Sequence, residues 1–307
     1  MIDHIHIKNF LTFDSLEIGT LKRINLIGGK NNAGKTSLLE ALLILISEGE
    51  NRVINSVLKN RGIFDKGSMR TYKELYHNNR KNGIADLTIN NFKIKADEVL
   101  KSYLIEYKER KRELSPSIIA DFNNEYFSYV PAHSSFNKIE KIWNTIALTK
   151  DENIVMEILQ KVIDSRISKL QIGSLAIRTQ IDGEPVDIKT LGEGVSRILY
   201  IAINLVAAKN KYILIDEIEA GLHYTAQEKL WEFIFEYAEK WNIQVFATTH
   251  SNDTIRTFKY ACTKYEKDGD IDAQYLRLQK SRSGKFEAIC YSGEKLGESL
   301  NLELETR

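Results

Sequence analysis

The fold is decided by the glycine-rich stretch Gly29-Lys30-Asn31-Asn32-Ala33-Gly34-Lys35-Thr36, in a chain of 307 residues. Glycines permit backbone conformations that turn several N–H groups toward one point, and a helix that follows such a loop adds its positive N-terminal end. Lys35 would then reach the β- and γ-phosphates of a nucleotide, and the Thr36 hydroxyl would bind Mg²⁺. The stretch therefore predicts a phosphate-binding loop. The predicted nucleotide contacts are Gly29, Asn31, Asn32, Ala33, Gly34, Lys35, Thr36 and Ser37.

The residues on both sides of this loop have the pattern that phosphate binding requires. The apolar run from Arg23 to Ile27 predicts a strand, and the leucine-rich stretch from Thr36 to Ser47 predicts a buried helix. Short strands around Ile5–Ile7 and Leu16–Ile18 are expected before the loop. A glycine loop with a chance lysine is the alternative, and the strand–loop–helix order weighs against it.

Two acidic residues follow the apolar run Tyr212-Ile213-Leu214-Ile215. Asp216 and Glu217 would lie at the carboxyl end of a buried parallel strand, which is where ligands bind in such sheets. Asp216 is predicted to hold Mg²⁺, directly or through water, and Glu217 to orient or deprotonate the attacking water. Glu219 is expected to cap or pair within the loop, and a catalytic role is the less favoured alternative.

A second apolar run, Ile243 to Thr248, leads into Thr249 and His250. A lone histidine is usually a polar group with a structural partner. At the end of a strand expected beside the Asp216 strand, His250 is predicted instead to sense the γ-phosphate. The predicted catalytic residues are therefore Glu217, His250 and Lys35, and the predicted metal ligands are Thr36 and Asp216. ATP and Mg²⁺ are the expected ligands, although no base-reading motif separates ATP from GTP.

Strands and helices alternate along the rest of the chain, which predicts an α/β fold with a largely parallel central sheet. Residues 1–307 are expected to form a single domain with an inserted lobe over residues 51–125. Within that lobe a strand pair is expected around Ile84 to Ala96, followed by a helical or extended stretch around Val99 to Arg112. Helices are expected at 138–147, 153–168, 194–209 and 225–241, a strand at 126–130, and hairpins at 174–188 and 274–291.

The segment 51–82 carries eight lysines and arginines against two acidic residues, a local charge of +6 in a chain whose net charge is +1. Such a segment could contact nucleic acid phosphates. A solvated basic lobe and a docking face for an acidic partner remain open alternatives.

The composition, 43% hydrophobic and 28% charged, is that of an ordinary globular protein. Cys262 and Cys290 lack the spacing of paired metal ligands, which argues against a zinc site or a disulfide framework and suits a reducing cytosol. The N-terminus has no signal pattern, and no apolar run is long enough to span a bilayer. A soluble cytoplasmic protein with no membrane contact is therefore expected.

The segment Thr190-Leu191-Gly192-Glu193-Gly194-Val195-Ser196-Arg197 opens a helix with two glycines. Glycines before a helix usually serve as caps. Together with the other three segments, however, the order resembles the ABC-type ATPase heads of SMC, RecF and OLD (overcoming lysogenisation defect) proteins, and most closely the OLD-like ATPases of bacterial phage-defence systems. The segments that carry the resemblance are 24–42, 191–194, 216–223 and 244–251; it extends over residues 1–47 and about 170–260.

This resemblance implies a site shared between two subunits. Residues Thr190 to Gly194 would be the signature segment that meets the γ-phosphate of the opposite subunit, with Thr190 or Gly192 in place of the usual serine. Two heads would then sandwich two ATP molecules as a homodimer or a higher homo-oligomer. Residues 221–223 would communicate across the dimer. Relatives carry a glutamine near Mg²⁺ in the loop after Val130, where this chain offers His133 and Ser134 as substitutes.

Full-length OLD proteins also carry a Toprim nuclease after the head, and the sequence after His250 is too short for one. Asp268, Asp270 and Asp272 mimic an acidic nuclease motif, but a solvated turn is favoured. A nuclease effector is therefore expected on a separate polypeptide. The preferred hypothesis is an ATPase whose head dimerisation controls such an effector or double-stranded DNA, in phage defence or DNA maintenance. The alternative is an ATP-bound scaffold with little turnover that docks a separate effector.

Overall fold

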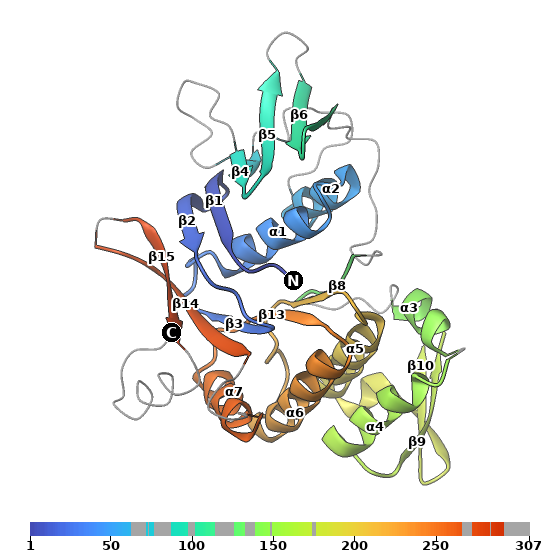
Figure 1. Ribbon diagram of the computed structural model, residues 1–307. Helices are drawn as coiled ribbons and strands as arrows, with labels where there is room; N and C mark the ends of the chain where they lie inside the picture. Colours follow the sequence, from blue (N-terminus) through green and yellow to red (C-terminus); the bar gives the residue numbers. More distant parts are fainter. Residues whose placement is uncertain are drawn as a thin grey trace. The chain divides into compact units, whose positions relative to one another are not determined.

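The computed structural model describes residues 1–62, 72, 74–76, 87–97, 102–113, 126–132, 139–147, 149–173, 176–265, 272–282 and 284–291. The chain forms two compact units, and it passes between them several times. The first unit contains residues 1–22, 29–127 and 276–290, and the second contains residues 23–28, 128–275 and 291–307. Figure 1 shows the elements of both units.

The first unit is built on a six-stranded sheet with the order β2-β1-β4-β5-β6-β7. Neighbouring strands pair antiparallel throughout. The expected N-terminal antiparallel strand set is therefore confirmed, and strands of the segment 51–125 continue the same sheet. The strands are β1 (Ile5–Phe10), β2 (Phe13–Ile18), β4 (Leu87–Ile89), β5 (Phe92–Asp97), β6 (Ser102–Tyr107) and β7 (Arg110–Glu113).

Two expectations for this segment can be compared with the sheet. The strand pair around Ile84 to Ala96 is the β4–β5 hairpin, and residues 84–86 lie outside the described residues. The stretch around Val99 to Arg112, for which helix and strand were both open, is extended in β6 and β7. Asn90 and the pair Lys108 and Glu109 have positive φ at the two tight turns, as short hairpin loops require.

Two helices complete the first unit. Helix α1 (Lys35–Ile46) is buried on nearly every side, as its leucine-rich sequence predicts. Helix α2 (Asn51–Asn60) buries Val53, Ile54, Val57 and Leu58 on one face. The mixed pattern of residues 51–125 did not predict α2. Arg61, which follows α2, donates hydrogen bonds of 2.6–3.0 Å to the buried Glu40 carboxylate and to Ser37, and this ties the end of α2 to α1.

The second unit contains the parallel strands β3 (Ile24–Gly28), β13 (Gln244–Thr248) and β12 (Tyr212–Ile215). They belong to a six-stranded sheet ordered β15-β14-β3-β13-β12-β8, with β8 (Phe127–Val130), β14 (Ala273–Lys280) and β15 (Phe286–Tyr291). The C-terminal hairpin strands are thus found as expected. The register pairs Ile215 with Ala247 and Thr248 with Ile27, so the carboxyl ends of β12, β13 and β3 lie at one edge. The expected adjacency of the Asp216 and His250 strands is confirmed.

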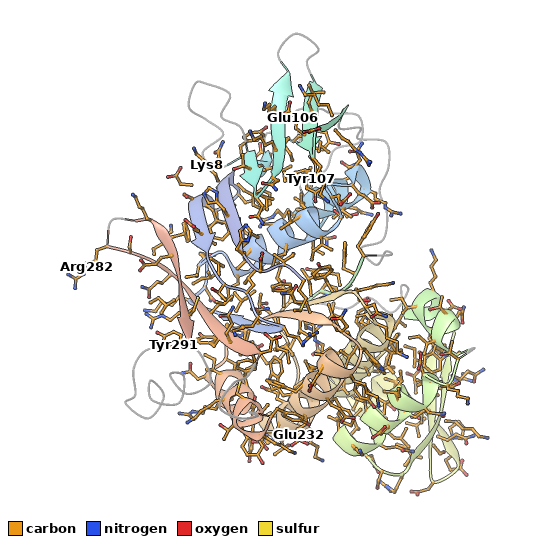
Figure 2. The ribbon with its side chains drawn as sticks, in the orientation of Figure 1. Lys8, Glu106, Tyr107, Glu232, Arg282 and Tyr291 are labelled. Carbon is orange, nitrogen blue, oxygen red and sulfur yellow. The ribbon has the colours of Figure 1, made fainter. Side chains whose placement is uncertain are left out.

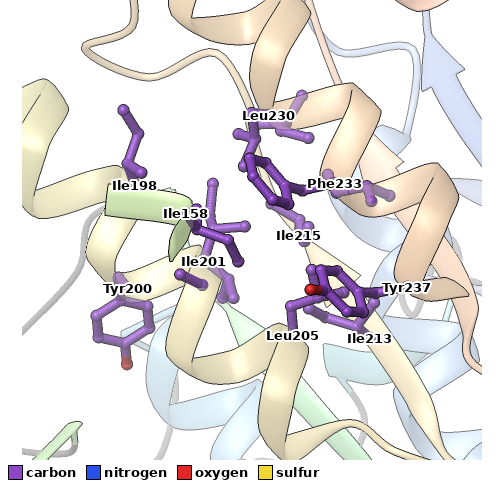
Figure 3. Close-up of a cluster of buried hydrophobic side chains, with 14 of the residues drawn as sticks. Ile158, Ile198, Tyr200, Ile201, Leu205, Ile213, Ile215, Leu230, Phe233 and Tyr237 are labelled. Carbon is purple, nitrogen blue, oxygen red and sulfur yellow. The ribbon is translucent and has the colours of Figure 1, made fainter. Parts of the chain in front are cut away.

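Helices pack an apolar core against these strands (Figure 3). Ile201 and Leu205 of α5 (Glu193–Ala207), Ile213 and Ile215 of β12, and Phe233 of α6 (Tyr224–Lys240) are all buried. Burying side chains of this size contributes about 1.5–3 kcal/mol each. Helices α3 (Ile139–Ile146), α4 (Glu152–Val162) and α7 (Asn252–Tyr265) complete the helical part. The four expected helices are confirmed apart from their ends, whereas the sequence pattern did not predict α7.

One expected helix extends further at its carboxyl end than the observed helix does. The helix expected over 153–168 ends at Val162, and residues 167–172 form strand β9 (Ile167–Ile172). The Asp164 carboxylate accepts the Arg166 backbone N–H at 3.0 Å, and such a bond favours a turn over a further helical turn. Strand β9 pairs with β10 (Ile177–Ile181), which forms the expected hairpin with β11 (Glu184–Asp187). In the described part of the chain, no helix is both long and apolar enough to cross a membrane.

Candidate functional site

The phosphate-binding loop lies in the first unit and is folded around its own lysine. The Lys35 ammonium donates to the carbonyl oxygens of Gly29 at 2.7 Å and of Lys30 at 3.2 Å. Gly34 has φ of 94°, and a Cβ there would lie 2.7 Å from the Phe13 ring. A Cβ at Gly29 would lie 2.4 Å from the carbonyl oxygen of Leu278. Both positions therefore require glycine for two reasons: the positive φ, and the lack of space for a Cβ atom.

The start of α1 continues this loop. Gly34 is the residue before the helix, so the first N–H groups of α1 lack partners within the helix and form an anion-binding end. Ser37 is buried, donates to Thr12 Oγ1 at 3.3 Å and accepts from Arg61 at 3.0 Å. These two contacts give Ser37 a structural role; its predicted nucleotide contact stays a prediction.

Replacing Gly34 with alanine should lower the stability of the protein by more than the backbone strain of a positive φ alone. Gly62 is the matched control, because it also has positive φ, but a Cβ there would meet nothing within 4 Å. Both substitutions force an L-residue into a left-handed conformation, at about 1–2 kcal/mol. Only Gly34→Ala adds the clash with Phe13, so it should lower Tm more than Gly62→Ala and also weaken binding of a fluorescent ATP analogue. Equal Tm shifts in the two variants would contradict the steric account.

The acidic pair lies in the second unit and is held by a threonine of the neighbouring strand. The Thr248 hydroxyl donates to Asp216 Oδ1 at 2.6 Å and accepts the Glu217 backbone N–H at 2.8 Å. Glu217 has φ of 50°, a conformation that non-glycine residues rarely adopt outside constrained sites. Its side chain is 40% exposed, whereas Asp216 is buried. One hydroxyl therefore fixes both the buried carboxylate and the turn that presents Glu217.

A buried arginine holds the same peptide from the other side. Arg197 of α5 is 4% exposed and donates to the carbonyl oxygens of Pro131, Asp216 (2.6 Å) and Glu217 (3.0 Å). Burial lowers the pKa of its guanidinium, and the negative charges of Asp216 and neighbouring glutamates oppose that shift. From the sequence, Arg197 stands out only as the last residue of the glycine segment. A basic residue in the second turn of a helix whose buried residues are mostly apolar was the available signal.

Replacing Arg197 with methionine should destabilise the second unit strongly. The carbonyl oxygens of Pro131 and Asp216 would lose this donor, whereas that of Glu217 keeps the Ala220 N–H at 3.0 Å. A carbonyl left unbonded in a buried position costs about 1–3 kcal/mol, so a loss of about 2–5 kcal/mol in unfolding free energy is expected. The exposed Arg178 of β10 is the matched control, and Arg178→Met should change stability by about 0.5 kcal/mol or less. Denaturant unfolding measures both. An Arg197→Met variant with the same free energy of unfolding as the wild type would show that solvent or other groups readily replace the guanidinium.

His250 is in contact with a second glutamate. Its Nδ1 lies 3.1 Å from Glu219 Oε1 and 3.8 Å from Glu217 Oε1, and its backbone N–H donates to Glu219 Oε1 at 2.8 Å. Glu219 is 8% exposed. The structure thus brings Asp216, Glu217, Glu219 and His250 together at the ends of two adjacent strands. Glu219 pairs within this loop cluster, as expected.

The signature segment approaches the loop that follows Glu217. A Cβ on Gly194 would lie 2.4 Å from the carbonyl oxygen of Gly221, so only glycine permits this approach. The Thr190 hydroxyl donates to the Asp187 carbonyl at 2.7 Å. Gly192 has φ of 102° and lines a pocket of ≈ 290 Å³. The pocket residues are Ala132, Lys189, Gly192, Glu193, Ser196, Arg197 and Ala220.

The side-chain oxygens predicted to bind Mg²⁺ are those of Thr36 and Asp216. Among the described residues, no group of three or more His, Cys, Asp and Glu side chains could hold a metal ion. Mg²⁺ in nucleotide sites typically takes one or two protein oxygens together with phosphates and water. The buried Asp216 carboxylate and the Thr36 hydroxyl are oxygens of that kind. They belong to different units, so their shared Mg²⁺ stays a prediction.

The other predicted residues divide between the units. The contacts from Gly29 to Ser37 lie in the first unit, and Thr190, Gly192, Gly194, Asp216, Glu217 and His250 lie in the second. The convergence of Lys35 with the acidic residues and His250 stays a prediction. His133, Ser134, Asp268 and Asp270 lie outside the described residues. Asp272 accepts the Arg23 backbone N–H at 2.9 Å, which is a structural contact.

Comparison with known proteins places these features in a family. A family profile described as an AAA ATPase domain matches residues 1–155 and 71–255. The chain belongs to this family of AAA ATPase domains. A Helicobacter pylori protein named ATP/GTP phosphatase is 24% identical over 320 residues, covering 83% of this chain and 86% of that protein. An uncharacterized Methanocaldococcus jannaschii protein is 39% identical over 85 residues, 26% of this chain and 38% of its own length.

Solved structures confirm the fold class. An SMC head bound to the C-terminal winged-helix domain of ScpA matches with a TM-score of 0.63 at 14% identity, covering 97% of this chain and 99% of that one. The Pyrococcus furiosus Smc head with an extended coiled coil, bound to the C-terminal domain of ScpA, has a TM-score of 0.52 at 11% identity, covering 98% and 99%. This AAA ATPase domain therefore has the α/β P-loop fold of SMC heads, and it is an ATP-binding ATPase.

Proposed function

We propose that this chain binds ATP with Mg²⁺ and hydrolyses it at a site completed by a second head. The observation that carries the proposal is the parallel pairing of β3, β13 and β12. This pairing puts Asp216–Glu217 and Thr248–His250 at the edge where β3 ends, and the phosphate-binding loop follows β3 directly along the chain. The Thr249 backbone N–H also donates to the Ile27 carbonyl at 2.9 Å, one residue before that end.

The proposed roles follow from the chemistry of each side chain. The Lys35 ammonium binds the β- and γ-phosphates, and Glu217 accepts a proton from the attacking water or orients it. His250 contacts the γ-phosphate. Mg²⁺, held by Thr36 and Asp216, would neutralise charge on the phosphate oxygens. The 40% exposure of Glu217 is compatible with contact to a water molecule, whereas the buried Asp216 suits a fixed ligand.

Dimerisation is the second part of the proposal. The signature segment, Thr190 to Gly194, meets the nucleotide of the opposite head. The close approach of Gly194 to Gly221 supports a link between this segment and the loop after Glu217. Such a link would let a partner's nucleotide influence the geometry of the hydrolytic residues.

The third part concerns the partner and the pathway. We place the chain in the OLD-like branch, with a separate Toprim-type nuclease or double-stranded DNA as the controlled partner, in phage defence or DNA maintenance. The structures of SMC heads with ScpA domains support the idea that a head of this fold docks another protein. The resemblance of segments 191–194 and 216–223 to OLD-like proteins supports the branch.

One observation favours the scaffold alternative, in which ATP is held with little turnover. The Glu217 carboxylate is 40% exposed and 3.8 Å from His250 Nδ1, which is beyond hydrogen-bond distance, so this contact does not fix the proposed base. Enzymes typically complete about 1–10³ turnovers per second. Steady-state phosphate release far slower than about one per minute, with stable ATP-dependent oligomers, would therefore favour the scaffold over a turnover enzyme.

Replacing Glu217 with glutamine should abolish turnover and preserve ATP binding. The amide keeps the size of the side chain but cannot accept the proton, so kcat for phosphate release should fall by about 10²–10⁴-fold. The Kd for ATP should stay within about threefold of the wild type, because Glu217 acts on the attacking water and not on the binding of the nucleotide. Glu236→Gln, which makes the same change at an exposed position of α6, is the matched control and should change neither value. Equal loss of turnover and binding would overturn the assignment of Glu217 as the base.

The first unit offers a specific surface for the proposed DNA contact. Arg52 and Arg61 of the basic segment are paired with Glu50 and Glu40, which weakens the case for them as phosphate ligands. The sheet instead carries a cross-strand row of Lys8, Thr88, Lys93, Glu106 and Lys111 along β1, β4, β5, β6 and β7. Lys8 and Lys93 are exposed, whereas Lys111 pairs with Glu106 Oε1 at 3.2 Å, so Lys8 and Lys93 are the preferred phosphate ligands of this row. Figure 2 labels Lys8 and Glu106 in this row.

Reversing two of these charges should weaken duplex DNA binding. The double variant Lys8→Glu, Lys93→Glu should raise the Kd for duplex DNA. It should also reduce the slope of log Kobs against log[salt] by about 0.9 for each phosphate that the protein no longer neutralises. Lys229→Glu, an exposed charge reversal on α6, is the control for net charge. Fluorescence anisotropy at several salt concentrations measures both quantities. Salt-insensitive binding, or equal effects of Lys229→Glu, would refute this DNA surface.

A further inference from the structure

Glu219 is a buried carboxylate to which the proposed reaction gives no role. Its side chain is 8% exposed, and its two oxygens have different surroundings. Oε1 accepts the His250 backbone N–H, whereas Oε2 is buried without a hydrogen-bond partner among the described residues. A buried carboxylate oxygen without a partner costs free energy. Stability alone therefore does not explain a glutamate here, and its contacts point to a different role.

Glu219 contacts His250 at two points. Oε1 is 2.8 Å from the backbone nitrogen and 3.1 Å from Nδ1 of the ring. This distance is short enough for the carboxylate to accept a proton carried on Nδ1, and a fixed proton on one ring nitrogen determines what the other nitrogen presents. The ring is otherwise half-exposed, and Glu217 lies farther away, at 3.8 Å. Glu219 is thus the nearer of the two carboxylates that the ring contacts.

The electrostatic surroundings explain how the site tolerates this second acid. Arg197 is buried close enough for the charges of Asp216 and Glu219 to act on its guanidinium and oppose the lowering of its pKa by burial. The hydrogen bonds that hold the arginine beside this loop go to three backbone carbonyls. Charge balance between Glu219 and Arg197 is therefore a competing structural explanation that an experiment must separate from a role through His250.

We propose that Glu219 is the positioning residue of His250: it holds Nδ1–H and the backbone N–H so that the opposite ring nitrogen, Nε2, faces the reacting phosphate. This inference rests on the proposed role of His250 at the γ-phosphate. It extends the proposed site from the pair Glu217 and His250 to an ordered series in which Glu219 orients the imidazole and the imidazole contacts the nucleotide. Glu219 itself touches no reacting atom.

A double-mutant cycle tests whether Glu219 acts through the histidine. Glu219→Ala should lower kcat for phosphate release by about 10–100-fold and change KM for ATP by less than about threefold, because the interaction acts mainly in the transition state. Adding Glu219→Ala to His250→Ala should lower kcat no further, because the residue to be positioned is already gone. Glu236→Ala, at an exposed site of α6, is the matched control. If Glu219→Ala does not fold, Glu219→Leu, which fills the space but has no acceptor, takes its place in the same cycle.

A spectroscopic measurement tests the contact without any turnover. The chain has six histidines, and His250→Ala identifies the His250 signals in long-range ¹H–¹⁵N spectra of the whole chain. In the wild type, Nδ1 of His250 should carry the proton. In the Glu219 variant that signal should shift toward the mixture of tautomers found in free histidine. A role limited to charge balance with Arg197 would leave the ring signals unchanged.

The possible failures are distinguishable. Full turnover in His250→Ala, with turnover abolished in Lys35→Ala, would overturn the proposed role of His250 and with it this inference. Loss of turnover in His250→Ala, with a further independent loss on adding the Glu219 change, would overturn the inference alone. Unchanged Nδ1 signals in the Glu219 variant would also overturn it, whatever the kinetics.

Discussion

The parallel register of β12 on β13 is the constraint on which the candidate site depends. It places Ile215 opposite Ala247, so that the residues after each strand end leave the sheet side by side. The Thr248 hydroxyl then connects the two strand ends, because it donates a hydrogen bond to the Asp216 carboxylate and accepts one from the Glu217 backbone N–H. A shift of one residue in this pairing would turn Thr248 to the opposite face of the sheet and separate it from both groups.

The buried polar groups at this edge form a connected set and not isolated pairs. Arg197 bonds to three carbonyls, and its charge lies near the carboxylates of Asp216 and Glu219. Removing such a cation from water is expensive, so a buried ionic group is weak evidence of a gain in stability, although removing one member of the group is strongly destabilising. Its burial in α5 therefore indicates that it specifies the geometry of one peptide, the one between Asp216 and Glu217.

Much of this fold could be predicted from the sequence because the signals were local. The loop from Gly29 to Thr36 and the apolar strand before Asp216 each carry their structure within a few residues, and their helices and strands were found. Helix α7 was missed because its polar surface residues dilute the apolar period. The helix expected over 153–168 ran into the first two residues of β9, because the turn that follows α4 depends on the Asp164 side chain and carries no glycine or proline. The roles of Arg197 and Thr248 could not be predicted, since each depends on a partner in another segment of the chain. For Glu219 the pairing was predicted, but its partner, His250, was not.

The unusual backbone of Glu217 shows why two adjacent acids can have different surroundings. In a continuing strand, Asp216 and Glu217 would point to opposite faces of the sheet, because side chains alternate. At φ of 50° the chain leaves the strand direction instead, and the Glu217 carboxylate comes within 3.8 Å of His250 while Asp216 stays buried against Thr248. A left-handed residue costs of order 1–3 kcal/mol and persists only where its surroundings fix it. Here Thr248 binds the amide of Glu217 and Arg197 binds its carbonyl, so the strained residue is held at both ends of its own backbone.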